Sequence, residues 1–472
     1  MALNVDQAAQ KIQSLVKDDG FLGTSRNEHL HEVQKVLSGF SGGDVNKIIG
    51  KLSADDLKGW AGDINHGGVF GAQGLSGDQK HDLMNEMAKE LDGTQLGRLS
   101  NAFNNRDDVV ALGKSVASFA SADTKVAYVK ALAPHASDRE FKTDTGFGSV
   151  SMQTGDKEAY AIGEVLTSLK GNSSAFNAAI GSLDKTQLGS VVKALENERV
   201  TTVASQGMAA TSVSYDPAPL KALLDTGAAS GNTNTKAALF QAASPAIAEI
   251  RDSNSLFSPN PGADASAKLV TQGLTALLNS DTRGITDRLN TVESGGSSLA
   301  GYLKEVVQED PSAKNGVIAR QLAQLQGAGT GLSAKDYIGK TATTADGKTY
   351  YRNAQTLGYY SGAVQAGINS STADAKTKGE IIGNIFTSSV FAVSAAVPGA
   401  PVAAKVGTVL FNGVGREVLR GIVADVAAGN KSLKEAFAEL ALPRDAGSPD
   451  RYRGPAEPYY QGTENTVILR NQ

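Results

Sequence analysis

The residues best suited to chemistry lie in a glycine-rich stretch from 62 to 77. Asp63 and His66 stand three positions apart there, and a carboxylate beside an imidazole is the arrangement that orients a general base. Glycine also lets the backbone approach a ligand closely. Two interpretations follow and both stay open. One is a hydrolase site built on Asp63 and His66, and the other is an ordered loop that fills a helical core and caps helix ends.

Other catalytic and phosphate-binding motifs fail on their surroundings. Residues Gly39 to Gly43 spell G-x-S-x-G, but the preceding residues have helical rather than strand periodicity, so we predict a helix corner there. Gly-Lys-Ser/Thr triplets begin at Gly113, Gly339 and Gly347, and none has the glycine five residues earlier that a phosphate loop needs. These motifs therefore predict no nucleotide site.

No metal or cofactor site is predicted either. The chain has no cysteine and 5 histidines, which removes thiolate ligands and leaves little material for a histidine-rich centre. His29 and His31 lie two positions apart on a predicted helix, so they point to different faces and suit a surface better than a shared metal.

Composition limits the class of protein. Ala and Gly supply 118 of the 472 residues, which indicates many helices with many breaks. A hydrophobic fraction of 40% is enough for packed cores. The net charge of −4, with no concentrated basic cluster, excludes a general nucleic-acid binder, because phosphate neutralisation needs a positive face.

The amino-terminal residues bear on localisation. Met1 to Val16 contains charged residues and no long apolar run, so it does not resemble a cleaved secretory signal. A cysteine-free chain without such a signal suits a cytosolic protein, or one that is cytoplasmic in the producing cell and then exported unfolded through a dedicated machine.

A short pattern recurs in the first 200 residues and predicts helical hairpins. Aligned on Leu52, Leu91 and Leu183, each copy has Asn six positions earlier, Ser or Asp directly after, and a second Leu five positions later. The Ser or Asp can cap the helix that follows. A weaker copy lies at Ser121, and Ser76 with Gln79 has capping-box spacing. The spacings between copies are irregular, which argues against a strict solenoid.

The remaining elements complete the predicted fold, which is mainly α. We expect β-hairpins at 199–215 and 341–352, further helices at 266–279, 298–309, 314–326 and 353–368, and irregular structure at 143–156. The predicted organisation is an N-terminal helical-hairpin domain (1–215), a middle helical domain (216–340), a C-terminal helical domain (341–442) and an extended tail (443–472).

A long uncharged stretch near the C-terminus carries the strongest functional signal. No charged residue occurs from Ile381 to Ala404, and Pro398 and Pro401 form a turn within the stretch. The pattern predicts an apolar helical hairpin over 381–426, whose first arm of 17 residues is marginal for a bilayer. Such a hairpin is either a domain core or a segment that enters a target membrane. Its candidate membrane-contacting residues are Ile381, Ile382, Ile385, Phe386, Val390, Phe391, Pro398, Pro401, Val409, Leu410 and Phe411.

This hairpin resembles that of pore-forming colicins and of the translocator proteins of injection-type secretion systems. The cysteine-free, acidic, Gly-rich composition resembles that of secreted bacterial effectors, including harpins. The resemblance implies a secreted bacterial effector or toxin that acts in virulence and is delivered to another cell without a cleaved signal. Its partners would be a target-cell membrane or protein, with a secretion chaperone or an immunity protein in the producer.

Three functions are therefore carried forward. The first is this effector, with 381–426 contacting a membrane. The second is a non-enzymatic helical scaffold that binds partner proteins, and the third is a hydrolase using Asp63 and His66. Enzymatic activity stays undecided at this point, and nucleic acid is excluded as a partner.

Overall fold

The computed structural model describes residues 3–17, 24–65, 75–103, 105–137, 141–144, 149–153, 155–205, 208–253, 260–292, 297–309, 316–325, 341–343 and 349–351, with scattered positions from 356 to 378. The chain divides into two compact units. Unit 1 comprises Met1–Thr235 and Ile250–Val270, and unit 2 comprises Lys236–Glu249 and Thr271–Gln472. The predicted mainly α fold is confirmed.

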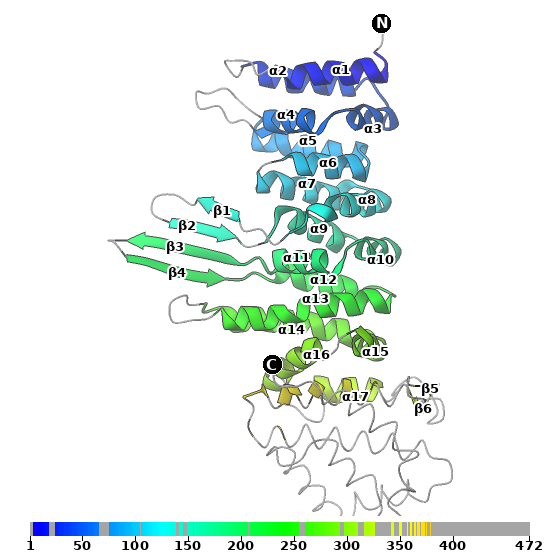
Figure 1. Ribbon diagram of the computed structural model, residues 1–472. Helices are drawn as coiled ribbons and strands as arrows, with labels where there is room; N and C mark the ends of the chain where they lie inside the picture. Colours follow the sequence, from blue (N-terminus) through cyan, green and yellow to red (C-terminus); the bar gives the residue numbers. More distant parts are fainter. Residues whose placement is uncertain are drawn as a thin grey trace, which may run out of the picture. The chain divides into compact units, whose positions relative to one another are not determined.

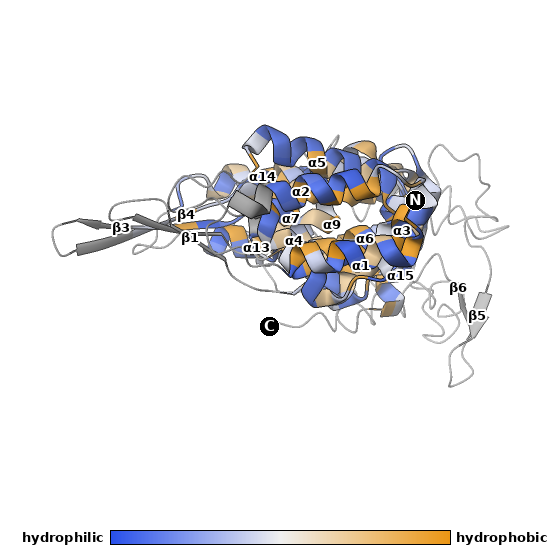
Figure 2. Cartoon of the chain, turned by 90° about the horizontal axis from the view of Figure 1, so that it is seen from above, coloured by the Kyte–Doolittle hydropathy of each residue, from blue (hydrophilic) through white to orange (hydrophobic). Residues whose placement is uncertain are grey.

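Unit 1 is built around a series of helices that follow one another closely (Figure 1). They are α1 (Val5–Val16), α2 (Thr24–Leu37), α3 (Gly42–Gly50), α4 (Ala54–Asn65), α5 (Gly77–Glu90), α6 (Gly93–Ala102), α7 (Arg106–Phe119), α8 (Ala122–Leu132), α9 (Lys157–Ser168), α10 (Ser173–Gly181), α11 (Lys185–Glu196) and α12 (Ala218–Ala229), with a short 3₁₀ turn η1 (Ala133–His135) after α8. Hydrophobic and hydrophilic residues occupy different faces of the same helices (Figure 2). In α1, for example, Ala8, Ala9, Ile12 and Val16 form the buried face.

Helices α4 to α11 of unit 1 form two stacks, one of the even-numbered and one of the odd-numbered helices. In one, α4 packs on α6, α6 on α8 and α8 on α10, and in the other α5 packs on α7, α7 on α9 and α9 on α11. Successive hairpins therefore stack in chain order, although the sequence copies are irregularly spaced. This stacking buries one continuous apolar core, which no single hairpin could form alone.

The corners predicted from the repeated pattern are confirmed. Asp92 accepts a hydrogen bond from the Gln95 amide at 2.9 Å, and Asp184 accepts one from the Gln187 amide at 2.8 Å. Ser121 caps α8 in the same way through the Thr124 amide. The Ser76–Gln79 capping box at the start of α5 is also complete, with both reciprocal hydrogen bonds present.

The Asn of the first copy of the pattern, Asn46, has a function that capping alone does not require. Asn46, on α3, accepts a hydrogen bond from the Asp92 amide at 2.7 Å and donates one to the Glu90 carbonyl at 3.3 Å. In return, Arg98 on α6 donates to the Ile49 carbonyl at 3.3 Å, at the end of α3. Each of these two hairpins therefore completes the corner of the other.

Small residues allow the stacked helices to approach closely. A Cβ atom on Gly93 would lie 2.2 Å from the Thr124 carbonyl oxygen and 2.3 Å from the Tyr128 nitrogen, both in the α8 backbone. A Cβ on Gly97 would lie 2.6 Å from the Ala131 Cβ. Glycine at these positions on α6 sets the spacing between α6 and α8, which accounts for part of the Ala- and Gly-rich composition.

A four-stranded antiparallel sheet interrupts the helices of unit 1. Its order is β1 (Phe141–Asp144), β2 (Ser149–Gln153), β3 (Arg199–Ser205) and β4 (Met208–Ser214). The β3–β4 hairpin confirms the prediction for 199–215. The expectation of irregular structure at 143–156 is wrong for residues 143–144 and 149–153, which form the end of β1 and the whole of β2. Strand β2 pairs with β3 from Ser149↔Val203 to Gln153↔Arg199, a partner some 50 residues away that local sequence does not reveal.

The described part of unit 2 is also mainly helical. Two helices have residues in each unit, α13 (Thr233–Asp252) and α14 (Ala263–Asn279), and α15 (Thr282–Val292), α16 (Ser297–Glu309) and α17 (Val317–Leu325) follow. The predicted helices at 266–279, 298–309 and 314–326 are thus confirmed to within three residues at each end. Strands β5 (Thr341–Thr343) and β6 (Thr349–Tyr351) form the predicted second hairpin, and the described positions from Thr356 to Ser370 are helical.

A buried hydrogen-bond network ties the helices of unit 2 together. Gln321 accepts from the Tyr360 hydroxyl at 2.6 Å and donates to the Tyr302 hydroxyl at 3.1 Å. Tyr302 also bonds to Thr275 at 2.8 Å. All polar atoms that such a network buries need partners, so it fixes how these helices pack.

Candidate functional site

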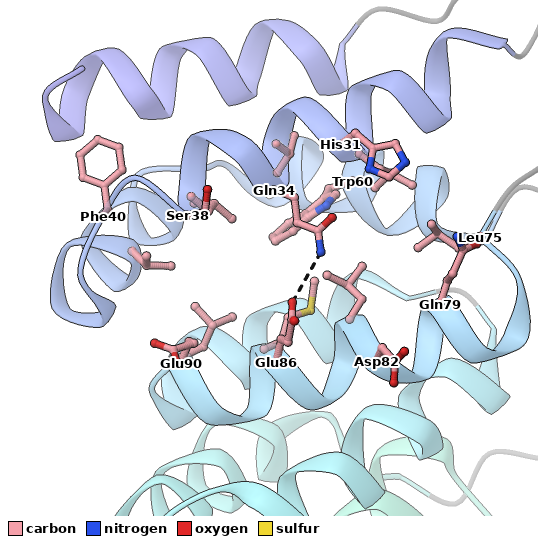
Figure 3. A pocket seen from close by; sticks show the side chains of 17 residues that line it. His31, Gln34, Ser38, Phe40, Trp60, Leu75, Gln79, Asp82, Glu86 and Glu90 are labelled. Carbon is pink, nitrogen blue, oxygen red and sulfur yellow. Dashed lines mark hydrogen bonds between the residues drawn. The ribbon is translucent and has the colours of Figure 1, made fainter. Parts of the chain in front are cut away.

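A cavity of about 490 Å³ lies between α2 and α5 in unit 1. Later helices pack directly on their neighbours in the stack, whereas α2 and α5 face each other across this space (Figure 3). We call it the α2–α5 groove. Its lining residues are Leu30, His31, Val33, Gln34, Leu37, Ser38, Phe40, Val45, Trp60, Leu75, Gln79, Asp82, Leu83, Glu86, Met87, Glu90 and Leu91.

The interior of the groove is apolar. Trp60, on α4, is only 2% exposed and lines the cavity together with the buried side chains of Leu30 and Val33 on α2 and Met87 on α5. Four large apolar side chains are only half-buried, namely Leu37, Phe40, Leu75 and Leu83. Apolar surface that stays accessible inside a cavity is typical of a binding site.

The two edges of the groove differ in chemistry. The α2 edge carries His31, Gln34 and Ser38, which are polar but contain no carboxylate. The α5 edge carries Asp82, Glu86 and Glu90 (Figure 3). A single hydrogen bond of 3.5 Å, from Gln34 Nε2 to Glu86 Oε2, spans the groove in this view, and a bond of that length is weak.

Local sequence explains how these edges are positioned. The Ser76–Gln79 box starts α5, and residues four apart on a helix share a face, so Asp82, Glu86 and Glu90 form one row. On α2, Glu32 does not line the groove but pairs with Lys11 Nζ on α1 at 3.2 Å. Hydrogen bonds from Lys11 and then Lys35 lower the pKa of Glu32. This pairing ties α2 to α1 and leaves the neutral face of α2 toward α5.

The structure changes the setting of the predicted catalytic pair. Asp63 belongs to α4, which continues to Asn65, so the expectation of a loop from residue 62 is wrong for its first four positions. Asp63 is 8% exposed. His66 lies outside the described residues, and the hydrolase site stays a prediction. Ser41 of the G-x-S-x-G motif precedes α3 at its N-cap position, as expected for a helix corner.

A second polar cluster lies at the start of α9. Glu158 is 6% exposed, and burial together with the neighbouring Asp156 carboxyl raises the pKa of Glu158 to about 8. Asp156 accepts from the Ser137 amide at 2.8 Å, and Lys157 Nζ donates to the Phe103 carbonyl at 2.6 Å. These bonds join α9 to the ends of α6 and η1, so we interpret the cluster as a structural junction.

The predicted apolar hairpin 381–426, with all eleven of its candidate membrane-contacting residues, lies outside the described residues. So does the tail 443–472. Among the helices that the structure describes, none combines the length and the hydropathy needed to cross a membrane. Within the same residues, no group of three or more His, Asp or Glu side chains is arranged to hold a metal ion.

Comparison with known proteins yields no relative on which to base a function. No protein-family description, no curated protein and no solved structure matches this chain.

The α2–α5 groove was not predicted from the sequence, although the four-residue spacing of the three acidic residues Asp82, Glu86 and Glu90 is visible there.

Proposed function

We propose that this protein is a non-enzymatic scaffold of stacked helical hairpins that binds a helical segment of a partner protein in the α2–α5 groove. The observation that supports it is the accessible apolar surface of Leu37, Phe40, Leu75 and Leu83 between two helices. Amphipathic helices bind by placing an apolar stripe into such a groove. A helix there would continue the packing seen further along the stack.

Trp60 makes the proposal simple to test, because it is the only tryptophan in the chain and it lines the groove. The full chain would be titrated with a designed, uncharged amphipathic helical peptide while the Trp60 emission is recorded. We expect a saturable change in emission.

Two matched variants test where the peptide binds. Leu83→Glu puts a charge into the groove at a half-buried position, and we expect it to abolish the response. Val292→Ser removes a side chain that is 45% exposed outside the groove lining, and we expect the response to persist. Circular dichroism checks that both variants are folded. An unchanged response in Leu83→Glu, or no response in the wild type, would contradict the proposal.

The sequence supports a second candidate function, an effector delivered to another cell whose 381–426 segment contacts a membrane. Its support is the charge-free run from Ile381 to Ala404. The full chain should then release dye from anionic liposomes, more strongly at acidic pH, and deletion of 381–426 should abolish release. Liposomes that stay intact from about pH 4 to 8 would rule it out. A secretion chaperone or an immunity protein would be the partner in the producing cell.

A further inference from the structure

The α2–α5 groove has an uneven charge distribution that points to the chemistry of its ligand. Asp82, Glu86 and Glu90 line the α5 edge and are all exposed. The α2 edge opposite them has no carboxylate. A ligand lying along the groove therefore meets an acidic row on one side and polar groups without a carboxylate on the other.

The carboxylates of the acidic row lack the lysine partners that other exposed carboxylates nearby have. Asp44 pairs with Lys47 at 2.8 Å, and Glu32 pairs with Lys35 at 3.2 Å. Among the described residues, no lysine or arginine forms an ion pair with Asp82, Glu86 or Glu90. The α5 residue Lys89 instead places its ammonium 4.9 Å from the centre of the Phe119 ring.

We infer that the ligand of the groove is a cationic amphipathic helix from another protein, with an apolar stripe toward Trp60 and Lys or Arg residues four apart toward Asp82, Glu86 and Glu90. This inference rests on the proposed function. The lining of α5 from Gln79 to Leu91 rises about 18 Å, which fits a helix of about three turns. An acidic edge repels phosphate, which argues against nucleic acid and anionic lipid as ligands.

The test compares three peptides that share one leucine stripe and differ only at three polar positions spaced four apart, which carry Lys, Gln or Glu. Each is titrated into the full chain with Trp60 emission as the readout. At low salt we expect the Lys peptide to bind about tenfold more tightly than the Gln peptide, which corresponds to about 1.4 kcal/mol. The Glu peptide should bind more weakly than both, and high salt should reduce these differences.

Two triple variants locate the charge effect. Asp82→Asn, Glu86→Gln and Glu90→Gln together should remove the preference for Lys over Gln and keep binding of the Gln peptide. The control neutralises three exposed carboxylates that do not line the groove, Asp55, Asp107 and Asp123, each to Asn. It changes net charge by the same amount and should keep the preference.

The possible failures are distinguishable. If the Gln and Lys peptides bind equally to the wild type, the inferred charge chemistry is wrong while the scaffold function stands. If no peptide changes the Trp60 emission, the proposed function itself fails. If light scattering shows a dimer of the full chain that the Asp82/Glu86/Glu90 variant dissociates, a second copy occupies the groove and the inference is overturned.

Discussion

Replacing Gly93 by Ala tests whether close backbone contact sets the spacing of the stacked helices. The new Cβ would lie 2.2 Å from the Thr124 carbonyl oxygen and 2.3 Å from the Tyr128 nitrogen. Non-bonded atoms prefer separations of about 3.5 Å or more, so α8 must move away from α6 by about 1 Å. Both obstructing atoms belong to the α8 backbone, so a side-chain rotation cannot relieve the contact.

The expected magnitude follows from two opposing effects. Overpacking a well-packed interface costs about 1–3 kcal/mol, and backbone obstruction places Gly93 at the upper end. Alanine's better helix propensity returns at most about 1 kcal/mol. We therefore expect Gly93→Ala to lower the free energy of unfolding of unit 1 by about 2 kcal/mol.

Gly189 provides the matched control. It lies inside α11, and a Cβ there would meet no atom within 4 Å. Gly189→Ala should therefore raise the free energy of unfolding by about 0.5–1 kcal/mol through helix propensity alone. Urea unfolding followed by Trp60 emission measures both variants. A Gly93→Ala protein as stable as the wild type, or two variants that change stability in the same direction, would refute the reasoning.

Three further predictions concern single polar side chains. Asn46→Ala should lower stability by about 1–2 kcal/mol in urea unfolding, because it leaves the Asp92 amide without its partner from α3; wild-type stability would show that the bridge is dispensable. Glu158 has a native pKa of about 8, above its ordinary 4.5, so the native state holds a proton that the unfolded chain releases between these values. Stability should fall as pH rises through that window, and Glu158→Gln should flatten the decline in a series of urea titrations; a slope equal to that of the wild type would place the proton elsewhere. Gln321→Leu should destabilise unit 2 by about 1–3 kcal/mol in thermal unfolding followed by circular dichroism, because it leaves the Tyr302 and Tyr360 hydroxyls buried without this partner; an unchanged midpoint would mean that the network adds no stability.

The helix corners could be predicted because capping is a local property. Ser76 with Gln79, and Asp184 with Gln187, form the capping boxes that their spacing indicates. Asp92 caps α6 as expected, but its own amide donates to Asn46 from the preceding hairpin rather than to the Gln95 side chain. Local spacing identifies the cap, whereas the second partner depends on how hairpins stack.

The features that could not be predicted depend on residues far apart in the chain. Strand β2 is held by hydrogen bonds to β3, about 50 residues further along the chain. The polar residues near 150 therefore do not predict a strand by their own pattern. The α2–α5 groove joins residues such as Gln34 and Glu86, which lie 52 positions apart. The glycine-rich composition predicts a loop from residue 62, yet α4 continues to Asn65, and its residues Asp63 and Ile64 are buried.

The hydrogen bonds that Asn46 and Arg98 form between neighbouring hairpins have a consequence for how the sequence can vary. Asn46 binds a backbone amide and a backbone carbonyl, and Arg98 binds backbone carbonyls at the opposite corner. Every residue other than proline offers these backbone groups, so the recognised corner positions are free to change side chain without losing the contact. Neighbouring hairpins can therefore diverge in sequence while their mutual registration is retained, as long as the two recognising side chains are kept.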